Sequence, residues 1–373
     1  MRCVSLDILR AVAVLLIMGA HIPNSLFLEK TPLSPMLSFW MRCGWTGVDL
    51  FFVLSGFLVS GLLFEEYKKY HKIDLLRFFI RRGLKIYPAF YVFLAVSTIL
   101  FWAQGRPLPH VRQYLDELFY IQNYYPRIFE HTWSLAVEEH FYLLIGFLVL
   151  LFSRIRGDNP FRFFVTIAKA LGVAILCFRV IHAYHVPYTH LTHLYPTHLR
   201  MDSLFFGVLL SYFHHFRHEQ VQDLVKNNTK VLLVVSLLLL APALRWSLFD
   251  PFMHSFGFTF LYLGYGGLLL LAVYCVDDKK IMDMKIFRFM ARIGVYSYSI
   301  YLWHILLARV FKYFVWPAHA HYFLFSCINL FIYIVGSVGL GIIMSLAIEM
   351  PLLHLRDKLF PSRSGLILER KRA

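Results

Sequence analysis

The sequence predicts an all-α fold: a polytopic membrane bundle of about ten transmembrane helices with both termini in the cytoplasm. Three observations support this prediction. Of the 373 residues, 59% are hydrophobic and only 16% are charged, and the mean hydropathy is +0.60. A soluble domain has about 25% charged residues. Long apolar runs recur along the whole chain, and the basic residues are concentrated in alternate loops between them.

The predicted spans are apolar segments, most of them close to the 20 or so residues that a bilayer requires. They cover residues 6–28, 47–64, 86–103, 134–153, 165–184, 199–214, 231–248, 256–275, 293–311 and 323–349. The shorter segments fit where the membrane thins or where neighbouring helices cover them. An even number of spans places both termini on the same side of the membrane.

The distribution of basic residues identifies that side as the cytoplasm. Lys and Arg gather after the second, fourth and eighth spans and in the tail: Lys68, Lys69, Lys72, Arg77, Arg81, Arg82, Lys85, Arg154, Arg156, Arg162, Lys279, Lys280, Lys285, Arg288, Arg292, Arg356, Lys358, Arg363, Arg370, Lys371 and Arg372. The loop after the first span holds only Lys30 and Arg42, and residues 186–198 hold none. The net charge of +15 is therefore mainly a topology signal. It excludes a nucleic-acid partner and predicts a multi-pass protein of the inner (plasma) membrane.

The sequence predicts neither a separate soluble domain nor a metal centre. We expect residues 1–353 to form the membrane domain and residues 354–373 to form a basic cytoplasmic tail. The first apolar stretch is too long for a cleaved signal peptide. The five cysteines have no metal or disulfide spacing. The histidines of residues 182–198 lack neighbouring cysteines or carboxylates in ligand spacing, so no metal is expected there.

Two polar residues stand out in the first span, where polar groups are functional candidates. Arg10 and His21 are eleven positions apart. At about 100° per residue this spacing is about three turns, so both side chains share one helix face, roughly 16 Å apart along the axis. Arg10 would lie near the inner surface and His21 in the outer half of the membrane. A polar passage along this face is the predicted reason for keeping both residues.

Other polar residues lie within or at the ends of the predicted spans. They are Asp49, Ser55, Trp133, Glu138, Arg200, Asp202, Tyr301 and His304. Asp49 and Glu138 both begin spans on the extracytoplasmic side, at about the depth of His21. Structural alternatives stay open: Asp49 as a helix cap, Ser55 as a packing residue, and the charged residues of 200–202 as buried ion pairs.

Several local patterns give the chain a resemblance to a known family. Arg10 and His21 match an arginine, ten residues and a histidine in the first span. Residues 47–56 match Gly-Val-Asp-x-Phe-Phe-x-x-Ser-Gly, residues 81–88 match Arg-Arg-x-x-(Arg/Lys)-Ile-x-Pro, and residues 133–138 match Trp-Ser-Leu-x-x-Glu. The chain resembles the acyltransferase 3 family of integral membrane acyltransferases. It departs from the family pattern at Ile8 and His140, and it lacks the extracytoplasmic esterase-like domain of many relatives.

The resemblance implies an O-acyltransferase, most simply an O-acetyltransferase. It would move an acyl group from cytoplasmic acyl-CoA (acetyl-CoA) to a hydroxyl of a cell-surface glycan such as lipopolysaccharide O-antigen or exopolysaccharide. The donor is a substrate, and no bound cofactor is expected. Two alternatives stay open: a small secondary metabolite as acceptor, and a transporter or channel that uses the same charged residues as a polar pathway.

The residues fit specific roles in that reaction. His21 would take the proton of the acceptor hydroxyl or carry the acyl group itself. Asp49 or Glu138 would orient the His21 ring or bind the acceptor. Arginine suits bidentate contacts with the phosphates of the donor, and the candidates for such contacts are Arg10, Arg81, Arg82 and Lys85. Further candidates for lining the site are Ser55, Trp133, Arg200, Asp202, Tyr301 and His304.

Overall fold

The computed structural model describes residues 3–23, 34–155, 159–313 and 322–363, and within these ranges every regular element is helical. The α-helices are α1 Val4–Ala20, α2 Ser34–Cys43, α3 Gly47–Tyr70, α4 Leu75–Ala103, α5 Val111–Leu118, α6 Trp133–Ser153, α7 Phe163–His185, α8 Met201–Phe216, α9 His218–Asn227, α10 Thr229–Leu240, α11 Pro242–Arg245, α12 Phe258–Tyr274, α13 Asp278–Asp283, α14 Lys285–Val295, α15 Ser297–Tyr313, α16 Tyr322–Met344 and α17 Met350–Leu359. Short 3₁₀ or π segments are η2 Gly44–Thr46, η3 Glu130–Thr132, η4 Pro160–Arg162, η5 His190–Leu194, η6 Thr197–Leu199, η7 Met253–Gly257 and η8 Ser345–Glu349.

The all-α membrane fold is confirmed, but the number of spans is confirmed only in part. Six described helical stretches are long and apolar enough to cross a membrane, and a seventh is counted if the pair 218–227 and 229–245, bent by 84°, forms one span. The remaining predicted spans fall on α1, α8 and α15, with 17, 16 and 17 residues. The first predicted span reaches residue 28, but α1 ends at Ala20 and residues 24–28 lie outside the described ranges. The count of ten spans stays a prediction.

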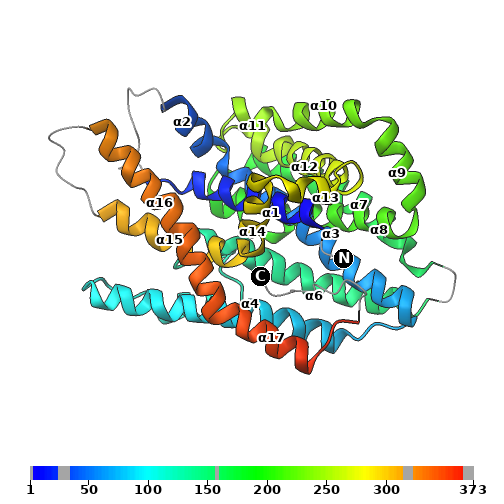
Figure 1. Cartoon of the computed structure of the whole chain (residues 1–373), viewed down its shortest axis with the longest axis horizontal. Coiled ribbons are helices and arrows are strands. Elements are labelled where there is room, and N and C mark those ends of the chain that lie inside the picture. Colours follow the sequence, from blue (N-terminus) through cyan, green and yellow to red (C-terminus); the bar gives the residue numbers. More distant parts are fainter. Residues whose placement is uncertain (1–2, 24–33, 156–158, 314–321, 364–373) are drawn as a thin grey trace.

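Helix α1 lies in the interior of the bundle (Figure 1). It packs against α3, α14 and α15, while α10 packs against α12 and α15 against α16. Its inward residues include Ala11, Val14 and Met18, none of which is exposed. Polar residues of α1 therefore sit among other helices instead of facing lipid, as the prediction of a polar passage requires.

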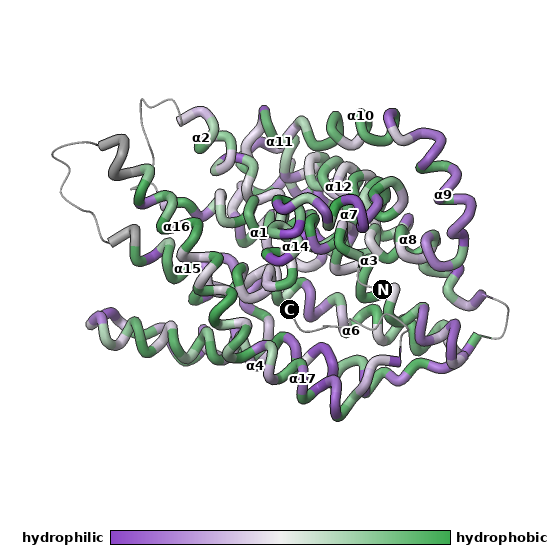
Figure 2. The backbone as a smooth tube through the Cα atoms, in the orientation of Figure 1, coloured by the Kyte–Doolittle hydropathy of each residue, from purple (hydrophilic) through white to green (hydrophobic). Residues whose placement is uncertain are grey.

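The hydropathy of the backbone separates membrane-facing elements from polar ones (Figure 2). Helices α4 and α16 are apolar for most of their length, whereas α9 at the edge of the bundle is largely hydrophilic. Exposed large hydrophobic side chains on α4 and α16 include Ile99, Trp102, Phe331 and Ile343. Such faces are stable in contact with lipid tails and are costly in water.

Helices α3 and α8 approach each other closely through two glycines. A Cβ atom added at Gly56 would lie 2.0 Å from the carbonyl oxygen of Leu204, and one added at Gly207 would lie 2.3 Å from that of Val53. Small residues are the usual means by which membrane helices bring their backbones together. This contact holds the motif of residues 47–56, which contains Asp49, against the first turns of α8.

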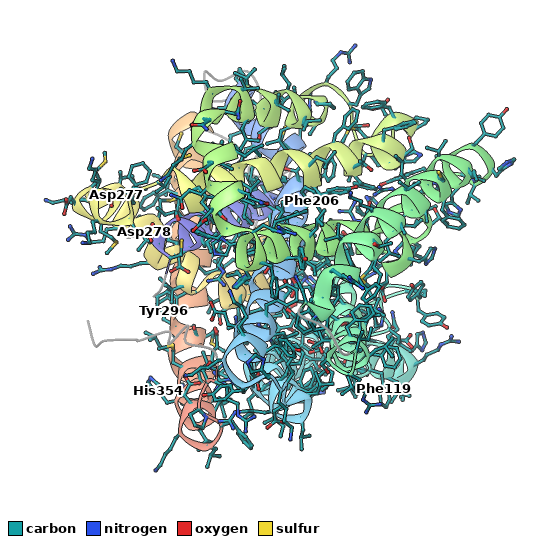
Figure 3. The ribbon with its side chains drawn as sticks, turned by 90° about the vertical axis from the view of Figure 1, so that its right-hand side faces the viewer. Phe119, Phe206, Asp277, Asp278, Tyr296 and His354 are labelled. Atoms are coloured by element: carbon teal, nitrogen blue, oxygen red, sulfur yellow. The ribbon has the colours of Figure 1, made fainter. Side chains whose placement is uncertain are left out.

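Both ends of the described chain are fixed at the side predicted to be cytoplasmic. Asp278 of α13, on the element that protrudes from the bundle in Figure 3, accepts hydrogen bonds from the backbone N–H groups of Val4 (2.8 Å) and Ser5 (3.0 Å) at the start of α1. The residues predicted to begin a tail instead continue α17 to Leu359, because Asp357 pairs with Arg81 of α4 at 3.0 Å. Residues 364–373 lie outside the described ranges.

The glycine contact yields a stability prediction. Gly56→Ala should lower the free energy of unfolding by about 1–3 kcal/mol, because the new methyl group forces α3 and α8 apart. Gly339→Ala is the matched control, since nothing lies within 4 Å of a Cβ at that helical position. Thermal unfolding of both variants in the same detergent measures the difference. Equal midpoints for the two variants would contradict the close approach.

Candidate functional site

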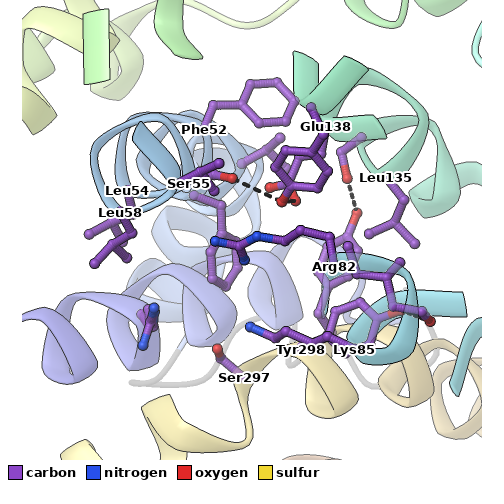
Figure 4. A pocket seen from close by; sticks show the side chains of 18 residues that line it. Phe52, Leu54, Ser55, Leu58, Arg82, Lys85, Leu135, Glu138, Ser297 and Tyr298 are labelled. Atoms are coloured by element: carbon purple, nitrogen blue, oxygen red, sulfur yellow. Dashed lines mark hydrogen bonds between the residues drawn. The ribbon is translucent and has the colours of Figure 1, made fainter. Parts of the chain in front are cut away.

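A cavity of about 110 Å³ opens among α1, α3, α4, α6 and α15 (Figure 4). Its polar lining residues are Arg10, Ser55, Arg82, Lys85, Ser134, Glu138, Tyr142, Ser297, Tyr298 and Tyr301. The rest of the lining is apolar and includes Phe52, Leu54 and Leu58. Five helices that are distant in the sequence therefore place polar side chains in one space within the bundle.

The cavity is cationic. Within the described chain, Arg82 and Lys85 make no ion pair, whereas Arg10 Nη1 is 2.8 Å from Asp7 Oδ1. The carboxylate of Glu138 accepts a hydrogen bond from the Tyr142 hydroxyl at 2.8 Å, and the guanidinium of Arg82 lies 5.6 Å from the centre of the Tyr142 ring. Cations that line a cavity without a protein counter-ion favour an anionic ligand.

Three histidines gather at the other end of α1. The Nδ1 atom of His21 lies 2.9 Å from the carbonyl oxygen of Ile17 and 3.3 Å from Nε2 of His304. The ring of His131 is centred 6.4 Å from that of His21 and 5.6 Å from that of His304. Together His21, His131 and His304 form the histidine cluster, which joins α1, η3 and α15.

The hydrogen bonds of the cluster assign its tautomers. His304 Nδ1 lies 2.7 Å from the carbonyl oxygen of Tyr301, so this nitrogen carries the proton and Nε2 is an acceptor. His21 must then donate from Nδ1, to the Ile17 carbonyl and toward His304. Its Nε2 consequently keeps a free lone pair. A neutral imidazole with one nitrogen fixed and the other free is the arrangement that a general base requires.

Tyr301 lies between the cavity and the histidine cluster. Its hydroxyl is 2.6 Å from that of Ser134, which also lines the cavity, and it donates to the carbonyl oxygen of His131. Its ring is centred 5.5 Å from the ring of His131 and 6.0 Å from that of His304. These contacts fix the ring between a residue of the cavity lining, Ser134, and two members of the histidine cluster, His131 and His304.

The segment that carries His131 is anchored by a buried carboxylate. Glu117 of α5 accepts hydrogen bonds from the Ile128 backbone N–H (3.2 Å) and the Thr132 hydroxyl (3.1 Å). Because the group is buried, its pKa is raised to about 7. Glu117 thus positions η3 and, with it, His131.

A model of the acyltransferase 3 family, described as an acyltransferase domain, matches residues 4–350. The chain belongs to the acyltransferase 3 family. It is 29% identical over 325 residues to the peptidoglycan O-acetyltransferase OatA of Listeria monocytogenes, covering 80% of this chain and 48% of that protein. It is 28% identical over 291 residues to the O-acetyltransferase OatA of Staphylococcus aureus, covering 71% and 46%. The chain thus spans about half the length of these curated relatives. No solved structure matches it.

Several residues predicted from the family motifs meet in the cavity, and others lie elsewhere. Arg10, Arg82, Lys85 and Glu138 line it together, with Ser55 and Tyr301. Arg81 does not line it, because its guanidinium pairs with Asp357 and donates to the Phe360 carbonyl. Of the predicted donor-binding residues, Arg81 is therefore the one whose guanidinium binds the C-terminal segment, residues 357–360, instead of facing the cavity.

The two carboxylates that were predicted to orient His21 or to bind the acceptor have other hydrogen-bond partners in this structure. Asp49 Oδ1 is instead 2.6 Å from Arg200 Nη2, and both side chains are almost fully buried. Glu138 bonds Tyr142 and lines the cavity. Neither carboxylate hydrogen-bonds His21 in the described chain, where His304 takes that place. A buried carboxylate pairs with a buried guanidinium first, because each is too costly to bury alone.

Three other predicted site residues, Trp133, Arg200 and Asp202, contact buried protein groups and do not line the cavity. Asp202 pairs with Arg179 at 2.6 Å, which gives the buried ion pair that was an alternative for this residue. Trp133 is buried with its ring 5.8 Å from that of Phe52, and the Arg200 guanidinium lies 5.8 Å from the Trp133 ring. Arg10 and Tyr301 line the cavity and His21 does not, so the passage from Arg10 to His21 stays a prediction.

Sequence reasoning missed His131 and Arg179. The signal for His131 was available, since it stands two residues before Trp133 in the stretch that begins the fourth predicted span. Arg179 lies in the middle of an apolar segment and is a buried charge within a span, which is a functional or pairing candidate in its own right. Among the described residues, no group of three or more His, Cys, Asp or Glu is arranged to hold a metal ion.

The Asp49–Arg200 pair can be tested for a role in stability, independently of any role in catalysis. Asp49→Ala should lower the free energy of unfolding by about 3–5 kcal/mol, because Arg200 is left buried and unpaired. The double variant Asp49→Leu/Arg200→Met should recover most of that loss, since an apolar pair carries no desolvation cost. Thermal unfolding in detergent measures both. A double variant as unstable as Asp49→Ala would show that the pair does not act as a unit.

Proposed function

We propose that this protein is an integral membrane O-acyltransferase that moves an acyl group from cytoplasmic acyl-CoA to a hydroxyl of a cell-envelope glycan. One observation supports it most directly. A cationic cavity suited to an anionic donor ends at Tyr301, directly beside a histidine cluster in which His21 keeps Nε2 free as a base. Donor site and base lie at opposite ends of one helix.

The proposed topology follows the distribution of basic residues. Both termini lie in the cytoplasm, and ten helical segments, of which α1 is the first, cross the inner (plasma) membrane. The short helices α1, α8 and α15 cross in the interior of the bundle, where other helices cover their ends. In this orientation Arg82 and Lys85 face the cytoplasmic half, and His21 and His131 face the extracytoplasmic half.

The donor end of the reaction lies at the cavity. Arg10, Arg82 and Lys85 bind the phosphate groups of acyl-CoA, which enters from the cytoplasm. The cavity has a volume of about 110 Å³ and combines the cationic side chains with an apolar lining. It suits the thin acyl-pantetheine end of the donor, whereas the nucleotide stays at the cytoplasmic mouth.

Chemistry takes place at the histidine cluster. His21 Nε2 accepts the proton of the acceptor hydroxyl as its oxygen attacks the thioester carbonyl carbon. A C–O bond forms, the C–S bond breaks, and the CoA thiolate leaves and takes the proton back from His21. His304 holds His21 in the tautomer that this step needs. Transfer by way of an acyl group on His21 Nε2 uses the same atoms in two steps.

Tyr301 must move for donor and base to meet. Its hydroxyl bonds Ser134 and the His131 backbone, so a small rotation of α15 or of η3 releases the ring. This structure then represents the closed state of the passage. A closed state also prevents the thioester from reaching water in the absence of acceptor.

The acceptor class follows the relatives. One is a peptidoglycan O-acetyltransferase and another an O-acetyltransferase, so an envelope glycan is the proposed acceptor and acetyl the proposed acyl group. Lipopolysaccharide O-antigen, exopolysaccharide and peptidoglycan all offer such hydroxyls.

The first test is His21→Ala in purified protein reconstituted into lipid nanodiscs. With radiolabelled acetyl-CoA and envelope glycan from a strain that lacks the gene, we expect transfer to fall by at least a hundredfold, in the range lost with a general base. His185→Ala, at an exposed histidine on α7, is the control and should keep full activity. Full transfer by the His21 variant would remove His21 from the chemistry. In sealed proteoliposomes of the same protein, label that accumulates inside without becoming covalently bound would indicate a transporter.

Donor binding is tested by Arg82→Gln, which removes a charge from the cavity and keeps a polar side chain. We expect the affinity for acetyl-CoA to fall by about 1–3 kcal/mol, the value of a charged hydrogen bond. Lys285→Gln changes an exposed basic residue of the same side outside the cavity and should leave the affinity unchanged. Calorimetry in detergent measures both. Equal affinities would show that the cavity is not the donor site.

A further inference from the structure

Three loops meet at the extracytoplasmic end of the bundle, above the histidine cluster. They are residues 119–132, 186–200 and 246–254. Asn123 Nδ2 donates hydrogen bonds to the Thr197 hydroxyl at 2.8 Å and the Tyr195 carbonyl at 3.2 Å, which joins the first two loops. The rings of Tyr188 and His254 stack with centroids 4.8 Å apart and join the second and third. These contacts form a shared floor from loops that are far apart in the sequence.

Aromatic rings lie exposed on this floor. Tyr124 and His198 stack almost in parallel, with centroids 5.9 Å apart and an interplanar angle of 11°. Tyr124 is 41% exposed and the adjacent Tyr125 is 38% exposed. The guanidinium of Arg127 lies 3.7 Å from the centre of the Tyr195 ring. Exposing an aromatic face to water is unfavourable. Exposed aromatic patches therefore usually mark a surface that a ligand or a membrane covers.

A carboxylate connects the exposed rings with the histidine cluster. Glu130 is exposed and directly precedes His131. The ring of His131 is centred 6.4 Å from that of His21, and Arg127 stands three residues before Glu130 in the same loop. Within the described chain Glu130 makes no ion pair closer than 4 Å, so its oxygens stay available to a ligand. We call Tyr124, Tyr125, Arg127, Glu130 and His198 the outer aromatic surface.

We propose that the outer aromatic surface is the acceptor subsite and binds a pyranose ring of a polyhydroxylated glycan. A sugar ring offers an apolar C–H face to the Tyr124–His198 pair and hydroxyl groups to Glu130 and Arg127. The assignment rests on the proposed function and deepens it, since it gives the acceptor a place next to His21. The unpaired cations Arg82 and Lys85 lie in the cavity on the donor side. The anionic donor would therefore contact cations, and the glycan would contact aromatic rings and a carboxylate.

Steady-state kinetics test the assignment, with the same reconstituted protein, acetyl-CoA and envelope glycan from the deletion strain. Tyr124→Ala should raise the KM for glycan roughly tenfold, because loss of one stacked ring costs about that factor in affinity. The KM for acetyl-CoA should change by less than about twofold. Tyr124→Phe keeps the ring but loses the hydroxyl that lies 3.3 Å from His198 Nδ1, and it should recover most of the glycan affinity lost in Tyr124→Ala, which also shows that the position tolerates substitution.

A second tyrosine distinguishes glycan binding from a role of Tyr124 at the membrane interface. Tyr184→Ala changes an 87% exposed tyrosine at the end of α7, outside the outer aromatic surface, and should leave both KM values unchanged. Equal effects of Tyr124→Ala and Tyr184→Ala would indicate a membrane-interface belt instead. An unchanged glycan KM in Tyr124→Ala, with transfer intact, would overturn the subsite alone. No transfer by the unmodified protein would overturn the proposed function and the subsite with it.

Discussion

The cost of burying charge in an apolar bundle governs this structure. Two ion pairs, Asp49–Arg200 and Arg179–Asp202, lie inside the protein with N···O distances of 2.6 Å and almost no exposure. Either partner alone would cost several kcal/mol in this environment. Because the pairs join α3, α7 and the start of α8, they fix the helices that form one wall of the bundle.

This constraint also explains how the site is divided. Asp49 is committed to Arg200, so it cannot orient His21, and that task passes to a neutral partner, His304. A histidine pair carries no net charge to bury, and it fixes the tautomer of His21 by hydrogen bonding alone. Two cations of the cavity, Arg82 and Lys85, in contrast make no ion pair in the described chain, whereas Arg10 pairs with Asp7. The charges that join helices are therefore paired, whereas Arg82 and Lys85 in the cavity are not.

The comparison with relatives gives this division a functional meaning. The family model matches residues 4–350, which include the cavity, the histidine cluster and both ion pairs. A membrane acyltransferase must bring a charged cytoplasmic donor and an external hydroxyl to one reactive group. The proposed roles of Arg10 and His21 would meet that need from the two ends of one central helix.

The sequence by itself determined the helical membrane class, the family and much of the cavity. Hydropathy, the positions of basic residues and local motifs are all short-range properties, so Arg10, Arg82, Lys85 and Glu138 were found without a structure. Only the tertiary structure decided the partners. The Asp49–Arg200 and Arg81–Asp357 pairs, the approach of His131 to His21, and the hydrogen bond from Tyr301 to the His131 carbonyl all depend on segments more than 100 residues apart. Pairing between buried groups is set by which faces meet when the helices pack, and no local pattern in one helix contains that information.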